Sequence, residues 1–428
     1  MSTTPERSPR PARMAAAWVA AAVLVSVALR LGLMGLRSGT FDDPDNYLPL
    51  ARSLAAGEGL SLKGRPTAYR PPLYPLVLAP IVTLLGDRPE RGVALLHLAL
   101  GAATVGLTSI AAARYGLGPA RVATAAWIVA LDPVLAWQAR SVMTETLSAA
   151  LVAAALAALT VPGRNGAVLG GGTLGLCALC RPSLLPAGAL TVLAALLVGP
   201  GDLRRRAGHA LVMGMTVLLT LAPWAIRNAT VLGEPVWTTT HGGYTLALAN
   251  NEVYYRDVLQ ADPGRVWTGR DQWFWWDSVN SATAGMTEPE ADRFLRDGVI
   301  RLARERPGTF LIASADRLAR FWSFAPASAV YGRAVRWGTA AWTVPLGVAL
   351  VLGLCRRSLW RWPEIAAPLQ LAGLSAVHCL YWTDLRMRAP IVPAIAVIAA
   401  AACVSFRRAR DDRSLRDQEA TTSSGSAA

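Results

Sequence analysis

The sequence predicts an all-α polytopic membrane protein with about ten transmembrane helices. Of its 428 residues, 53% are hydrophobic and only 16% are charged, and the mean hydropathy is +0.35. Apolar runs of about 16 to 23 residues, long enough to cross a bilayer, recur along the chain, whereas a soluble protein would spread its apolar residues over shorter periodic stretches. We expect membrane spans at 14–36, 92–113, 119–138, 142–161, 166–180, 183–200, 207–227, 334–354, 364–382 and 389–406.

The distribution of arginine predicts the orientation, because cytoplasmic loops of membrane proteins are enriched in basic residues. With ten spans, the basic N-terminus, the loops at 204–206 and 356–361, and the basic tail all fall on one side. We therefore expect a multi-pass plasma-membrane protein with both termini in the cytoplasm. The predicted organisation is a disordered N-terminus (1–13), a transmembrane module (14–227) with a first outer loop (37–91), an extracytoplasmic loop region (228–333), C-terminal transmembrane helices (334–406) and a disordered tail (407–428).

Residues 71–86 are apolar but short and rich in proline. Counting them as a full span would place the arginine-rich loops outside, against the positive-inside rule. We interpret them as a juxtamembrane helix that lies at the outer leaflet or dips into it.

Acidic residues gather at the start of the first outer loop. Asp42, Asp43 and Asp45 precede Tyr47 and a short amphipathic stretch. One interpretation is capping, because the helix dipole favours carboxylates before a helix N-terminus. The other is that they contact a substrate at the membrane surface.

An arginine follows in the same loop, just before Pro71-Pro72. The Arg70 guanidinium, next to Tyr69, offers a permanent charge and a planar fork of donors at headgroup depth, which suits a lipid phosphate. The alternative is an interfacial arginine that extends its charge to the headgroups.

Further charged residues lie at predicted outer ends of spans. Glu145 is either functional or a first-turn helix charge, and the topology places it on the same face as Asp43, so both could line one cavity. Arg386 and Arg388 begin the last span on the outer side, where basic residues are uncommon. They suit a leaving phosphate, and the alternative is an ion pair with Asp384.

The loop region 228–333 contains a Gly-, Tyr- and Asn-rich stretch suited to binding sugar hydroxyls. Its candidate residues are His241, Tyr244, Asn250 and Asn251. The run DQWFWWD at 271–277 fits either stacking on a sugar or anchoring in the headgroups.

A helix follows in the same region. Thr287 and Glu290 are spaced as a capping box, which predicts a scaffolding helix that ends at Pro307-Gly308.

Five motifs occur in a set order in the first half of the chain: Asp43-x-x-x-Tyr47, ARSLAAGEGLS, PTAYRPPLYP, the TET of 144–146 and the RPSLLP of 181–186. Two longer stretches, 222–251 and 294–322, follow. Together they resemble the GT-C superfamily of membrane glycosyltransferases that use polyprenyl-phosphate sugars. The resemblance is greatest to the family of bacterial protein mannosyltransferases and the aminoarabinose transferase that modifies lipid A.

The resemblance implies a GT-C-like fold and transfer of a sugar from a polyprenyl-phosphate donor to an acceptor hydroxyl on the extracytoplasmic face, with inversion. It implies that Asp43 is the general base, that Arg70, lysine in some relatives, contacts the donor phosphate, and that Glu145 places the acceptor or binds a metal. Asp42 and Asp45 leave the assignment of the base open, because relatives often carry Asp-Glu where this chain has Asp43-Pro44.

Several points stay open at this stage. No cofactor is certain, and a divalent cation (Mg or Mn) between Asp43 and Glu145 is an open alternative. The expected partners are the donor lipid, the bilayer and an acceptor glycan, lipid or protein, with no nucleic acid. The alternative function is a multi-span transporter or flippase of lipid-linked sugars.

Overall fold

The computed structural model describes residues 10–35, 41–86, 88–261, 270–327 and 330–403. Most of this part of the chain is α-helical, and the predicted all-α membrane class is confirmed. The predictions for 1–9 and for the tail lie outside the described residues.

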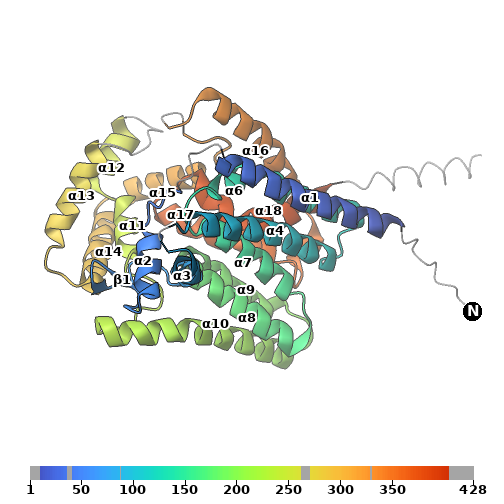
Figure 1. Cartoon of the computed structure of the whole chain (residues 1–428), viewed down its shortest axis with the longest axis horizontal. Helices are drawn as coiled ribbons and strands as arrows, with labels where there is room; N and C mark the ends of the chain where they lie inside the picture. Colours follow the sequence, from blue (N-terminus) through green and yellow to red (C-terminus); the bar gives the residue numbers. More distant parts are fainter. Residues whose placement is uncertain (1–9, 36–40, 87, 262–269, 328–329, 404–428) are drawn as a thin grey trace, which may run out of the picture.

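Long apolar helices form a bundle (Figure 1). Five of them in the described part are long and apolar enough to cross a membrane, so the predicted count of about ten spans stays a prediction. The bundle consists of α1 (Arg10–Gly35), α4 (Glu90–Arg114), α5 (Pro119–Leu131), α7 (Glu145–Ala158), α8 (Gly163–Cys180), α9 (Leu185–Val198), α10 (Leu203–Leu232), α16 (Arg333–Leu354), α17 (Ala366–Leu380) and α18 (Val392–Ala402).

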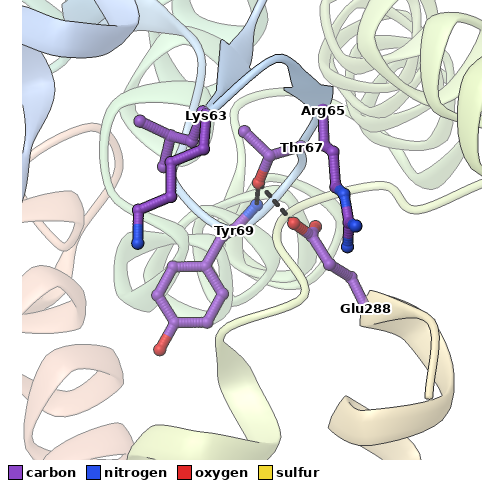
Figure 2. Close-up of a pocket in the computed structure, with 6 residues that line it drawn as sticks. Lys63, Arg65, Thr67, Tyr69 and Glu288 are labelled. Carbon is purple, nitrogen blue, oxygen red and sulfur yellow. Dashed lines mark hydrogen bonds between the residues drawn. The ribbon is translucent and has the colours of Figure 1, made fainter. Parts of the chain in front are cut away.

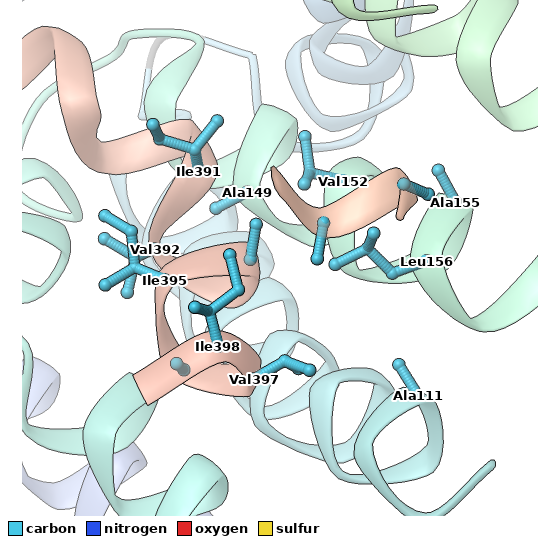
Figure 3. Packing of buried hydrophobic residues seen from close by; sticks show 14 of the residues in the cluster. Ala111, Ala149, Val152, Ala155, Leu156, Ile391, Val392, Ile395, Val397 and Ile398 are labelled. Atoms are coloured by element: carbon cyan, nitrogen blue, oxygen red, sulfur yellow. The ribbon is translucent and has the colours of Figure 1, made fainter. Parts of the chain in front are cut away.

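Helix α18 is the centre of the bundle. Every residue from Val392 to Ala401 is buried, and Figure 3 shows Val397 on the side of Leu156 and Ala111, with Ile395 on the opposite side of the helix. A helix that is hydrophobic all round is stable only where other helices surround it. The small alanines that α7 presents, such as Ala149 and Ala155, let the two helices approach closely.

One predicted span contains a break between two helices. Residues 119–138 form two helices, α5 and α6 (Pro133–Gln138), because the chain leaves the helical conformation at Asp132. Proline disfavours helical geometry in the residue before it, and the Asp132 carboxylate then caps α6 by accepting the Leu135 N–H at 2.8 Å.

The last predicted span also starts differently. It opens with the 3₁₀ segment η4 (Leu385–Ile391) and becomes α-helical only at Val392.

The first outer loop folds into a short helix, a hairpin and a second helix. These are α2 (Tyr47–Ala55), β1 (Ser61–Leu62), β2 (Arg65–Pro66) and α3 (Leu73–Leu85). Strands β1 and β2 are antiparallel, with Leu62 opposite Arg65. Helix α3 confirms that 71–86 is helical, and its depth at the outer leaflet stays a prediction.

The region after α10 gathers at one end of the bundle with the first loop (Figure 1). Its elements are α11 (Gly242–Leu248), α12 (Glu252–Tyr254), the π-helical segment Tyr255–Ala261, α13 (Arg270–Ala282), α14 (Glu288–Glu305) and α15 (Pro307–Phe321). The predicted capping box of Thr287 and Glu290 is confirmed at the start of α14. Arg317 joins this region to the bundle, because its guanidinium donates to the carbonyls of Ala249 and Cys379, both at 2.7 Å.

Candidate active site

Two loops that are far apart in the sequence are joined by backbone pairing. Asp42 and Ser141 form a parallel β-bridge, and the Val142 N–H donates to the Asp42 carbonyl at 2.8 Å. This pairing brings the first-loop aspartates next to the start of α7, where Glu145 lies. The pairing therefore brings the backbone that carries Asp43 close to the backbone that leads into Glu145.

The Asp43 carboxylate caps α2. Its Oδ1 accepts the Tyr47 N–H and its Oδ2 accepts the Leu48 N–H, both at 2.8 Å, which confirms the capping interpretation. Burial raises the pKa of Asp43 above its usual range, although the two N–H groups and Arg70 act in the opposite direction. Each carboxylate oxygen keeps a second lone pair, so the group can still accept a proton.

Arg70 is held in place by Asp45. Its Nη2 meets Asp45 Oδ1 at 2.8 Å and its Nε donates to the Asp45 carbonyl at 3.2 Å. The guanidinium also lies over the Tyr69 ring, 5.3 Å from its centroid. These three contacts orient a half-buried cation beside the Asp43 cap.

Glu145 is fully buried and pairs with a residue that was not among the candidates. Arg181 Nη1 lies 3.1 Å from Glu145 Oε1 and 3.2 Å from Thr144 Oγ1. The sequence carried one signal, because Arg181 is the first residue of the RPSLLP motif directly after α8. A single sequence does not show which carboxylate such an arginine meets.

The two arginines of η4, Arg386 and Arg388, lie in different surroundings. Arg386 lies near Glu145, with its Nε 3.4 Å from Asp384 Oδ2 and its Nη1 3.1 Å from the Met143 sulfur. Arg388 is buried, donates to the Ser323 carbonyl at 3.3 Å and lies over the Trp322 ring. The ion pair with Asp384 is thus present for Arg386, and Arg388 is committed to internal packing.

Aromatic side chains of the first loop and of α11 meet beside Arg70. The Tyr69 ring lies edge-on to His241 at 4.3 Å, and His241 stacks on Tyr244 at 5.1 Å. Burial and the nearby Arg70 lower the pKa of His241 well below its usual value, so its imidazole is neutral at pH 7. This cluster gives the site a flat, uncharged wall.

The remaining sequence candidates have structural roles. Asn250 donates to the carbonyls of Leu246 and Leu380, both at 2.8 Å, and Asn251 caps α12. Tyr47 is buried edge-on against Tyr74, and Asp42 is exposed beside its β-bridge.

In α13, Trp273 and Phe274 are about two-thirds exposed, at 68% and 69%. Their predicted role, stacking on a sugar or anchoring in headgroups, stays open.

Glu288, the first residue of α14, was also missed. Its Oε1 accepts the Thr67 hydroxyl at 2.6 Å, and its Oε2 accepts the Ala68 N–H at 3.0 Å and the Thr240 hydroxyl at 2.8 Å. Figure 2 shows this carboxylate between Thr67 and Arg65. The sequence presented Glu288 only as an ordinary first-turn acid.

Few side chains of the site could act as ligands to a metal ion. Within the described ranges, no group of three or more His, Cys, Asp or Glu side chains is arranged to hold a metal ion. The loop pairing brings together the segments that carry Asp43 and Glu145.

The overall fold is similar to that of solved oligosaccharyltransferase structures, in agreement with the fold that the sequence resemblance implies. The chain is similar to the oligosaccharyltransferase AglB from Archaeoglobus fulgidus in complex with an inhibitory peptide and a dolichol-phosphate. The TM-score is 0.55 and the identity 15%, over 95% of this chain and 52% of AglB. A structure of the same enzyme with Zn and sulfate gives a TM-score of 0.51 at 14% identity, over 90% of this chain and 48% of that one.

A further neighbour is ArnT from Cupriavidus metallidurans bound to undecaprenyl phosphate. Its TM-score is 0.39 and its identity 15%, over 90% of this chain and 77% of ArnT. The chain spans about half the length of AglB. No protein-family model and no curated protein sequence matches it.

Proposed function

We propose that the protein is a membrane glycosyltransferase that moves a sugar from a polyprenyl-phosphate donor to an acceptor hydroxyl on the extracytoplasmic face. The observation that carries the proposal is the backbone pairing of Asp42 with Ser141 and Val142, within a GT-C fold. In this proposal the pairing joins the segment that carries Asp43 and the Asp45–Arg70 pair to the segment that leads into Glu145, the partner of Arg181. AglB, with a dolichol-phosphate in its structure, supports a lipid-phosphate donor.

In the proposed reaction, Asp43 takes the proton from the acceptor hydroxyl. The acceptor oxygen attacks the anomeric carbon as the bond from that carbon to the phosphate oxygen breaks. The attack comes from the side opposite the phosphate, so a single displacement inverts the configuration. The proton ends on Asp43 and the electron pair on the departing polyprenyl phosphate.

Arginines stabilise the departing phosphate. We assign this role to Arg70 and Arg386, because each is already oriented by an aspartate, Asp45 or Asp384. Guanidinium groups that are oriented before the reaction stabilise developing phosphate charge without reorganising. Glu145 and Arg181 support the start of α7 next to them. If a divalent cation takes part, Asp43 and Glu145 are its ligands in this proposal. A divalent cation is considered because an AglB structure contains Zn.

The test is transfer by the purified protein with a panel of short-chain polyprenyl-phosphate sugars. Asp43→Asn should lower the transfer rate by about 10²- to 10⁴-fold, the usual contribution of a general base. The asparagine oxygen can still accept one N–H of α2, so the variant should fold, and its thermal unfolding is measured alongside. Undiminished transfer by Asp43→Asn would overturn the assignment.

The same assay separates transfer from transport. A transporter or flippase would move the donor across vesicles with its sugar–phosphate bond intact. Release of free polyprenyl phosphate only in the presence of an acceptor supports the transferase.

A further inference from the structure

A cavity lies beside the proposed site, next to the β1–β2 hairpin. Its volume is about 400 Å³, and it is lined by Leu62, Lys63, Arg65, Thr67, Tyr69 and Glu288 (Figure 2). Its back wall is fixed, because Arg227 donates to the carbonyls of Leu60 and Thr67 at 2.7 and 2.8 Å and Glu288 holds Thr67 and Ala68.

The mouth of this cavity is positively charged. Lys63 and Arg65 are both exposed, while the Glu288 carboxylate is occupied by three hydrogen bonds from the protein. Two cations with free donors therefore face one carboxylate whose acceptors are largely used. Such a mouth favours an anionic group over a neutral one.

The turn of the hairpin presents Lys63 in an unfavourable conformation. Lys63 and Gly64 have φ values of 52° and 73°, as a two-residue turn of type I′ requires. Asparagine or glycine is preferred at the first of these positions, and lysine costs stability there. Lys63 is also the only lysine of the chain. The Lys63 amine therefore lies at the cavity although its backbone conformation favours asparagine or glycine.

Tyr69 connects the cavity to the proposed active site. Its ring lines the cavity, contacts His241 and lies next to the Arg70 guanidinium. An aromatic face beside cations suits a sugar ring that carries an acidic substituent. The donor phosphate is assigned to Arg70 and Arg386, so a ligand in this cavity approaches from the acceptor side.

We infer that this cavity binds an anionic sugar unit of the acceptor, carrying a carboxylate or a phosphate. Lys63 and Arg65 hold the acidic group, and the Tyr69 ring packs against the sugar. That the bound sugar belongs to the acceptor rests on the proposed function. The binding of an anionic sugar in this cavity does not depend on catalysis.

The single lysine makes the binding directly measurable. Pyridoxal phosphate forms a Schiff base with an amine, borohydride reduces it, and peptide mass spectrometry distinguishes Lys63 from the N-terminal amine. Glucose 1-phosphate and glucuronate should slow modification of Lys63 in a saturable manner in the purified full-length protein, and glucose should not. Arg65→Ala should weaken this protection about tenfold, the size of one charge-assisted hydrogen bond.

The matched control is Arg88→Ala, which removes an exposed arginine of the same loop that does not line the cavity. It should leave the protection unchanged. Absence of protection by both anionic sugars, or equal protection by glucose, would overturn the inference. So would protection by phosphatidylglycerol vesicles in place of the sugars, since that result assigns the cavity to a lipid headgroup.

The outcomes separate the two proposals. Protection that persists in Asp43→Asn, together with loss of transfer, supports both. If the native protein transfers the sugar but no ligand protects Lys63, the proposed binding in the cavity is wrong and the proposed function stands. If Lys63 is protected but the native protein shows no transfer, the proposed function is wrong and the binding stands.

Discussion

Arg181 lies 3.1 Å from Glu145, and the glutamate side chain has no exposed surface while that of Arg181 is 13% exposed. Charges removed from water in this way depend on each other, because either one alone would carry an uncompensated desolvation cost. Replacing Arg181 with methionine should therefore lower the free energy of unfolding by about 3 kcal/mol. Thermal unfolding in detergent would measure the loss.

The double variant Arg181→Met with Glu145→Gln is the control for this pair. It removes both charges and should recover much of the lost stability. An unchanged unfolding temperature in Arg181→Met would mean that Arg386 alone compensates Glu145.

The acid limit of transfer should reflect Asp43. Burial raises its pKa, and only the ionised carboxylate can take a proton, so the rate should fall as the pH drops through a value above the ordinary aspartate pKa of about 3.9. Arg70 lowers this pKa, so Arg70→Met should move the acid limb to higher pH in a pH–rate profile. The control Arg52→Met, at an exposed position on α2, should leave the limb in place.

The single lysine offers a test of the predicted topology. A membrane-impermeant amine reagent applied to intact cells or spheroplasts should label Lys63, because the first loop is predicted on the outer face and this side chain is exposed. Lys63→Asn should abolish the labelling and keep the hairpin, since asparagine favours the type I′ turn. Labelling of Lys63 only after permeabilisation would place the loop in the cytoplasm.

Glu288 should order the segment that carries Tyr69 and Arg70. Glu288→Gln retains the shape but replaces one of the two acceptor oxygens that serve Thr67, Ala68 and Thr240 with an NH2 group, so amide hydrogen exchange at 67–70 should accelerate. Transfer should weaken with it. Glu252→Gln removes an acid of the same outer region, in an exposed pair with Arg306, and should leave this exchange unchanged.

The helical fold could be predicted from the sequence because apolar length and arginine asymmetry are properties of single segments. The break in the helix within the predicted span 119–138 has a local cause, since Asp132 before Pro133 ends one helix and caps the next. The Asp132-Pro133 pair in the sequence indicates this break, but a hydropathy average over the whole apolar run hides it.

The site could be predicted only in part. Asp43, Arg70 and Glu145 carry recognisable local patterns, whereas the roles of Arg181 and Glu288 depend on which distant group each one meets. For Asn250 the sequence predicted a ligand contact, because it is a polar residue in a Gly- and Tyr-rich loop. In the structure its side-chain amide instead donates to backbone carbonyls of α11 and α17. Pairings across such sequence distances are not encoded in local composition.

The position of Arg386 near Glu145 has a consequence for biogenesis. The first loop, the start of α7 and the RPSLLP segment are all synthesised long before η4, the last element to reach the site. During translation, Glu145 and Arg181 can meet while Arg386 and the central helix α18 are still absent. The bundle therefore closes late around its most apolar helix, and chains truncated before η4 should be targets for membrane quality control.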